Sequence, residues 1–108
     1  MKNNKITKHI LYIGLNDKDT KTQQISTLDA YKIIQNTIQA AGYTGATITE
    51  ATGFYIHDNG TPVIEKSLRV EIMFATNKTT LDIIQQLKKT LNQESIALQV
   101  EKVDSFLI

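Results

Sequence analysis

The chain contains no cysteine and no tryptophan, and only one proline and one arginine, in 108 residues. Without cysteine there can be no disulfide, no thiol catalysis and no cysteine-ligated metal or iron–sulfur site. The twelve basic and eleven acidic residues leave a net charge of only +1. Proteins that bind nucleic acid normally carry a clear basic excess or stripe, so this balance argues against a nucleic-acid partner.

Long hydrophobic runs are also missing. The apolar run at residues 10–15 is too short for the core of a secretory signal, and charged residues follow it. No segment approaches the roughly 18 apolar residues that cross a membrane. We therefore predict a cytoplasmic protein with no membrane partner. With 41% hydrophobic residues the chain can form one domain over residues 1–108, of which residues 1–8 are expected to be flexible.

Two segments show the helical spacing of apolar residues. The first begins at Ser26 or Thr27, whose hydroxyl can cap free backbone N–H groups, and ends at Gly42. Its apolar stripe consists of Tyr31, Ile33, Ile34, Ile38 and Ala41. The second spans residues 79–91, and its stripe consists of Leu81, Ile83, Ile84, Leu87 and Leu91.

Four segments predict β-strands, over residues 9–15, 46–57, 63–75 and 96–103. The third alternates one row of side chains, Leu68, Val70, Ile72 and Phe74, with a second row, Ser67, Arg69, Glu71 and Met73. Such alternation is typical of a half-buried strand.

A single hairpin should join the second and third strands. The turn is predicted at Asp58-Asn59-Gly60, because Asn and Gly accept positive φ at low cost. Gly53, inside the second strand, suggests a β-bulge or a close approach of another backbone.

The element order is therefore βαββαβ, which predicts an α+β, ferredoxin-like sandwich: a four-stranded antiparallel sheet with two helices on one face. The other face has to meet solvent or a partner. Tyr55 and Met73 lie on it, so it is not uniformly polar. Together with the apolar residues 106–108, this favours a homo-oligomer formed through the sheet.

The middle of the chain resembles the PII-type signalling proteins. Residues 42–54 are similar to the family's segment from the end of the first helix to its ligand loop. Residues 69–73, the second helix and residues 100–104 continue the register. The resemblance implies a PII-like trimer with its sheets facing inward and with effectors held in clefts between subunits.

The chain also departs from the PII pattern. The long loop that PII proteins use to touch partners is reduced to a short turn around Asn59. The family's glycine-rich phosphate segment is replaced by residues 92–95. ATP and 2-oxoglutarate are therefore not implied for this chain, and the sequence names no cofactor.

A second resemblance is to a family of small uncharacterised bacterial proteins. It rests on a glycine and an aromatic before a turn, followed by a Glu-x-Ser step into the next strand. The matching residues are Gly53, Tyr55, Asp58, Gly60, Glu65 and Ser67. This family brings no activity that could be transferred.

Six residues are candidates for binding a small anionic ligand: Lys18, Gly53, Tyr55, His57, Lys66 and Arg69. Arg69 could grip a carboxylate or phosphate with two parallel hydrogen bonds. The plainer interpretation is an ion pair with Glu50 or Glu71, within one chain or between subunits. Lys18 belongs to the polar segment 16–24, which is either a lid or a solvated connector.

The hairpin tip carries a second possible site. His57 could act as a general base or a metal ligand beside Asp58, although turn propensity alone explains the aspartate. Metal sites usually need three or four ligands, so no metal site is assigned. No catalytic residue is assigned either.

The leading hypothesis is a non-catalytic PII-like oligomer with a signalling role, which binds a small ligand or a protein partner. One alternative is a small ferredoxin-fold enzyme, similar to cofactor-free oxygenases, with Tyr55, His57 and Arg69 around its cleft. An apolar pocket beside His57 would favour that alternative. The other alternative is a structural assembly subunit.

Overall fold

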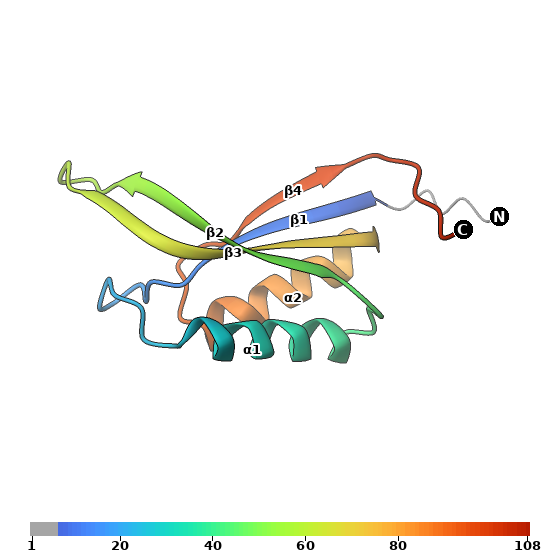
Figure 1. Ribbon diagram of the computed structural model, residues 1–108, viewed down its shortest axis with the longest axis horizontal. Coiled ribbons are helices and arrows are strands. Elements are labelled where there is room, and N and C mark those ends of the chain that lie inside the picture. The colour runs from blue at the N-terminus through green and yellow to red at the C-terminus, as the bar shows by residue number, and fades with distance from the viewer. Residues whose placement is uncertain (1–6) are drawn as a thin grey trace.

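The computed structural model describes residues 7–108, which form one sheet covered by two helices (Figure 1). The elements in chain order are β1 (Thr7–Gly14), α1 (Thr27–Ala40), β2 (Thr47–Ile56), β3 (Pro62–Ala75), α2 (Asn77–Thr90) and β4 (Ala97–Glu101). The strand order is β2-β3-β1-β4, and every neighbouring pair is antiparallel. The predicted ferredoxin-like fold is confirmed. The flexible segment predicted for residues 1–8 lies largely outside the described residues, and its last two residues begin β1.

The helix boundaries follow from local chemistry. Ser26 is the N-cap of α1, and its hydroxyl accepts a hydrogen bond of 3.1 Å from the backbone N–H of Asp29, as predicted. Gly42 follows the helix end with a φ of +98°, which glycine adopts without strain. α2 begins at Asn77, two residues before the predicted start, and Thr76 makes no side-chain cap bond there.

The core lies between the helices and one face of the sheet. Its largest fully buried apolar side chains are Leu11, Ile13, Ile34, Leu68, Ile72, Ile83 and Leu87. Two predicted members of the helix stripes do not belong to it, because Tyr31 and Leu81 are exposed. Thr80 is buried beside Leu81 instead, since its hydroxyl has hydrogen-bond partners in the interior.

The alternation predicted for β3 holds through Ile72 and fails at Phe74. Phe74 has a φ of +55°, and the pairing with β1 shifts there, from His9 opposite Ile72 to Thr7 opposite Ala75. The bulge adds one residue to β3, so Ala75 takes the buried position that was predicted for Phe74. The bulge or close approach predicted at Gly53 is wrong. The β2–β3 register is continuous there, and a Cβ on Gly53 would meet nothing within 4 Å.

The hairpin turn lies where it was predicted. The backbone N–H of His57 donates to the carbonyl of Thr61 at 2.9 Å, and that of Gly60 donates to the carbonyl of His57 at 2.8 Å. Within this turn only Gly60 has positive φ, at +84°. Asn59 contributes differently from the prediction, because its side-chain oxygen accepts a hydrogen bond from the backbone N–H of Thr61.

The end of the hairpin projects beyond the helices (Figure 1). We call residues 53–65 the projecting end. On the face that the helices cover elsewhere, Phe54 is 82% exposed and Ile64 is 74% exposed. β3 therefore runs from solvent at Pro62 into the core at Ala75.

Candidate ligand-binding cleft

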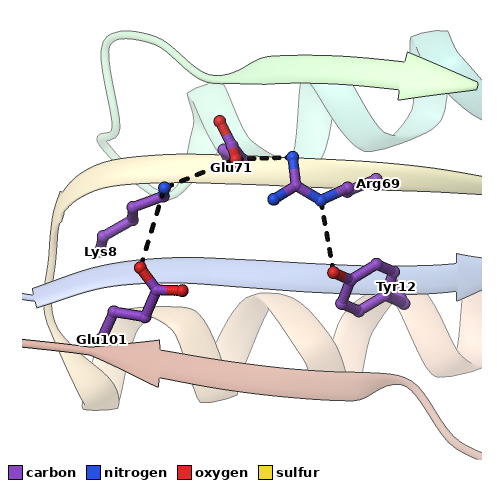
Figure 2. A network of polar contacts seen from close by, with 5 residues as sticks. All are labelled: Lys8, Tyr12, Arg69, Glu71 and Glu101. Atoms are coloured by element: carbon purple, nitrogen blue, oxygen red, sulfur yellow. Dashed lines mark hydrogen bonds and ion pairs between the residues drawn. The ribbon is translucent and has the colours of Figure 1, made fainter.

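The open face of the sheet, opposite the helices, carries a network of paired charges at one end (Figure 2). A guanidinium nitrogen of Arg69 lies 2.6 Å from a carboxylate oxygen of Glu71. The ammonium group of Lys8 lies 3.6 Å from Glu71 and 3.8 Å from Glu101. We call these four residues the paired end of the open face. The ion pair of Arg69 with Glu71, the plainer of the two interpretations, is thus present in this single chain. Glu50 is not its partner, because Glu50 pairs with Leu68 on the helix-covered face.

Tyr12 borders this network. Its hydroxyl lies 3.4 Å from Nε of Arg69, and the guanidinium carbon lies 5.9 Å from the centre of its ring. The hydrogen bonds to Tyr12 and Glu71 raise the pKa of Arg69 above its usual value. The hydrogen bond from Arg69 holds the pKa of Glu71 below its usual value. Each of the four charged side chains at the paired end therefore has a partner of opposite charge within the same chain.

A cleft of about 660 Å³ opens at the other end of the same face. Its lining comes from the end of β1 and the following loop (12–21), from β2 and the turn (51–58), from Glu65 and Ser67 of β3, and from the segment before and into β4 (93–97). A volume of this size fits the range of small-molecule sites.

Glu65 lines the cleft, and its carboxylate packs against Gly14 and the backbone N–H of Asn16. A Cβ on Gly14 would lie only 2.5 Å from one carboxylate oxygen of Glu65, so only glycine allows this approach. The other carboxylate oxygen accepts a hydrogen bond of 3.0 Å from the backbone N–H of Asn16. The Glu65 carboxylate therefore lies at a defined place in the cleft. The sequence singled out Glu65 as part of a family pattern and as a neighbour of Arg69 and Glu71 on one strand face, and Gly14 not at all.

Two aromatic rings lie on the hairpin side of the cleft. The rings of Tyr55 and His57 meet edge to face, with their centres 5.1 Å apart and their planes at 85°. Burial raises the pKa of the Tyr55 phenol, and the negative charges of Glu65 and Glu94 raise it further. The carboxylates of Glu65, in β3, and Glu94, in the segment before β4, therefore both act on the Tyr55 phenol.

The six predicted ligand-binding residues separate into two groups. Lys18, Gly53, Tyr55 and His57 line the cleft. Lys66 and Arg69 do not. Lys66 pairs with Thr52 on the opposite face of the sheet, and Arg69 belongs to the paired end.

The loop at residues 16–24 is attached to the end of α2. The carboxylate of Asp17 accepts hydrogen bonds from the side-chain amide of Asn92 at 2.8 Å and from the backbone N–H groups of Asp19 and Thr20. These bonds, the one from Asn92 above all, lower the pKa of Asp17. The side-chain amide of Gln93 donates to the carbonyl of Asn16 at 2.7 Å. The start of the loop is therefore a fixed wall of the cleft.

A second polar cluster lies in the interior, away from the cleft. His9 is fully buried, and its ring nitrogens lie 2.7 Å from the hydroxyl of Thr80 and 2.8 Å from that of Thr7. The hydroxyl of Tyr43 lies 3.1 Å from that of Thr80 and accepts a hydrogen bond from the backbone N–H of Thr76. Burial lowers the pKa of His9. His9, to which the sequence assigned no role, joins β1 to the start of α2.

Residues 7–108 offer neither a metal cluster nor a membrane-spanning helix. No group of three or more His, Cys, Asp or Glu side chains in this part of the chain is placed to hold a metal ion. Neither described helix, each of 14 residues, is long and apolar enough to span a bilayer.

Three solved structures have a similar fold. The first is a phage SAM lyase in complex with S-methyl-5'-thioadenosine, with 19% identity, a TM-score of 0.70 and coverage of 92% of this chain and 82% of the lyase. The second is CutA from Synechococcus elongatus PCC7942, with 13% identity, a TM-score of 0.61 and coverage of 92% and 79%. The third is GlnK of B. subtilis in its ATP complex, with 12% identity, a TM-score of 0.52 and coverage of 89% and 83%.

At these identities the similarity establishes the fold alone, and at that level the predicted resemblance to PII proteins is confirmed by GlnK. No curated protein sequence matches this chain. The hairpin pattern of the second resemblance stays a prediction. Residues 8–106 match the family model described as protein of unknown function DUF3574, and the chain belongs to that family.

Proposed function

We propose that the protein is a PII-like homo-oligomer that binds a small molecule in the cleft of its open face. The observation that carries this proposal is the Glu65 carboxylate, fixed over Gly14 by the backbone N–H of Asn16 inside a cleft of about 660 Å³. The Glu65 carboxylate is partly buried and forms no ion pair with residues 7–108, which leaves it available to a ligand. The cytoplasmic location and the signalling role predicted from the sequence belong to this proposal.

The exposed apolar side chains support the oligomer. Phe54 and Ile64 lie together on the projecting end, and Leu107 is 79% exposed. Solvent-exposed apolar groups of this size favour contacts between copies. In a trimer formed through the sheets the cleft would lie at a subunit boundary. Light scattering coupled to size-exclusion chromatography should give the mass of three chains. A monomer across the micromolar range would contradict the oligomer.

A cleft-filling variant tests the ligand site. Ser67 lines the cleft, whereas Gln99 lies on the same face outside it, opposite Ile10. A thermal-shift screen of nucleotides, amino-acid derivatives and small ions should give at least one compound that raises Tm. Ser67→Phe should abolish that shift, and Gln99→Phe should keep it, with the oligomer mass measured for both variants. A shift that survives Ser67→Phe would place the ligand elsewhere and contradict the proposal.

An enzyme is the second candidate. Tyr55 and His57 lie together at a cleft, but charged side chains line it where that hypothesis asks for an apolar pocket, and Arg69 lies outside it. The similarity to a SAM lyase favours S-adenosylmethionine as the substrate to test. Chromatography with mass detection should then find consumption of S-adenosylmethionine and formation of S-methyl-5'-thioadenosine, and Tyr55→Phe should slow both. If neither a ligand nor turnover is found, a structural assembly subunit is the remaining alternative.

A further inference from the structure

The charges that line the cleft are mainly negative. Four carboxylates line it, those of Asp17, Asp58, Glu65 and Glu94. Only two ammonium groups do, those of Lys18 and Lys21. Both lysines are exposed on the loop surface, where their long stems let the charge move into solvent. Glu65 has no such freedom, because its carboxylate is fixed between Gly14 and Asn16.

Two of these carboxylates lack a counter-charge. The ion pairs within residues 7–108 all belong to the paired end and use Lys8, Arg69, Glu71 and Glu101. Neither Glu65 nor Glu94 forms an ion pair with any described residue. Glu65 is half-buried in a concave surface, where its field is screened less than on an open one, and the exposed Glu94 adds to that field.

Aromatic rings accompany these carboxylates. Tyr55 lies close enough to feel the charge of both Glu65 and Glu94. Tyr12 lines the cleft as well, and its ring already has the guanidinium of Arg69 at 5.9 Å. Carboxylates combined with tyrosine rings recognise organic cations, because the ring faces and the carboxylates attract positive charge together. Apolar atoms of Ala51, on the same face of β2 as Tyr55, could meet the uncharged part of such a ligand.

We propose that the cleft binds an organic cation, a sulfonium or quaternary ammonium group on a larger body, with its charge beside Glu65, Glu94 and Tyr55. This inference rests on the proposed ligand site and names the chemistry of its occupant. It replaces the anionic ligand expected from the sequence. Two of the cations on which that expectation depended, Lys66 and Arg69, lie outside the cleft.

Calorimetric titration of the full chain with two matched pairs tests the inference. S-adenosylmethionine and S-adenosylhomocysteine differ by a methyl group and the positive charge on sulfur. Choline and 3,3-dimethyl-1-butanol have nearly the same shape, but only choline is charged. The cationic member of at least one pair should bind about tenfold more tightly than its neutral partner. The pair that responds distinguishes a sulfonium from an ammonium ligand.

Two substitutions test which carboxylate binds the cation. Glu65→Gln keeps an oxygen for the N–H of Asn16 but removes the charge, and should weaken cation binding about tenfold. Glu71→Gln, at the paired end of the same strand, should leave it unchanged. Melting curves check that both variants fold, and Glu65→Asp, which keeps the charge, should retain part of the affinity.

Several results would overturn the inference. One is equal binding of the charged and neutral members of both pairs. Another is cation binding that survives Glu65→Gln. If neither cation binds, the inference is also wrong. Binding of an anion such as ATP or 2-oxoglutarate that Ser67→Phe abolishes would overturn it while leaving the proposed ligand site intact.

Discussion

The β2–β3 hairpin has a base, which includes residues 68–71 of β3, and a projecting end, residues 53–65. Both are built from the same two strands in one continuous register, yet they differ on both faces. At the base, the helices cover Leu68, and the ion pair of Arg69 and Glu71 satisfies the charges on the open face. At the projecting end, Ile64 is exposed on the first face and Glu65 is unpaired on the second. The base stabilises the fold, and the projecting end offers surface to something else.

The difference follows from the lengths of the elements. Each helix has 14 residues, which gives about 21 Å at the rise of an α-helix. β3 also has 14 residues, which in extended conformation gives about 46 Å. Helices of this length cannot cover such a strand. An uncovered length of hairpin is therefore built into the fold, and its side chains are free for a ligand or a second copy.

The largest expected effect comes from a pair of truncations in β3, one over the core and one in the projecting end. Leu68 and Ile64 lie on the same face of that strand, four residues apart. Leu68→Ala should lower the free energy of unfolding by about 2–5 kcal/mol, because it leaves a cavity in the core. Ile64→Ala should change it by less than about 0.5 kcal/mol in the isolated chain, since that side chain is already in water. Urea unfolding followed by circular dichroism measures both.

This pair of variants also tests the oligomer. If Ile64 is buried between copies, Ile64→Ala should reduce the mass measured by light scattering or make the unfolding midpoint depend on protein concentration. Equal losses of stability for the two substitutions at a concentration where the protein is monomeric would refute the contrast between the two ends.

A pH dependence should come from the covered part of the sheet. Burial lowers the pKa of His9 below its ordinary value of 6.5, so the unfolded chain takes up a proton more readily than the folded one. The stability linked to His9 is complete above about pH 6.5 and is lost as the pH falls through the pKa of the folded state. One proton gives a slope of at most about 1.4 kcal/mol per pH unit.

The measurement is the difference in unfolding free energy between pH 7 and pH 5. His9→Gln should remove part of this difference. If His9→Gln does not fold, an NMR titration of the His9 ring in the unaltered protein reports the pKa directly. A His9 ring that titrates at or above 6.5 would contradict the prediction.

The fold could be predicted from the sequence because periodicity and turn chemistry act locally. The cap at Ser26, the turn at Gly60 and the element order were all correct. The errors came where tertiary contacts override a local pattern. Phe74 left the buried row because β3 gains one residue against β1, and Thr80 displaced Leu81 because His9 offers its hydroxyl a partner. Neither contact can be inferred from spacing along one strand or helix.

The cleft was predicted less completely for the same reason. Tyr55 and His57 belong to the hairpin, so their common side followed from alternation. The contribution of Gly14 and of the turn at residues 92–93 required knowing which loops meet at that end of the sheet. Arg69 was a candidate because a single arginine on a sheet face can bind a carboxylate or a phosphate group. Its neighbour Glu71, two residues away on the same face, occupies it instead.

A smaller effect should follow from a single methyl group at the cleft. Gly14→Ala places a Cβ where the Glu65 carboxylate now lies, so the carboxylate must move. Glutamate is flexible, so the unfolding free energy should change by less than about 1 kcal/mol. The backbone N–H of Asn16 loses its acceptor, and its hydrogen exchange should become faster by NMR. Unchanged exchange at Asn16 would mean that Glu65 is not held as described. Gly45→Ala, at a glycine with no neighbour within 4 Å, is the control.

The smallest effect is expected from the paired end, although it carries the most ion pairs. Arg69 and Glu71 are both partly exposed, so solvent screens their attraction and ordering two side chains costs entropy. Glu71→Gln should lower Tm by less than about 4 °C at low salt. The loss should shrink further in 1 M NaCl, where the Debye length is about 3 Å.

Since the hydrogen bond from Arg69 lowers the pKa of Glu71, the contribution of this carboxylate is present above its ordinary pKa of 4.5 and is lost as the pH falls below that value. Thermal melts of the parent, Arg69→Gln, Glu71→Gln and the double variant give the coupling between the two residues. A coupling as large as the loss from Leu68→Ala would mean that the open face, and not the core, stabilises the base of the hairpin.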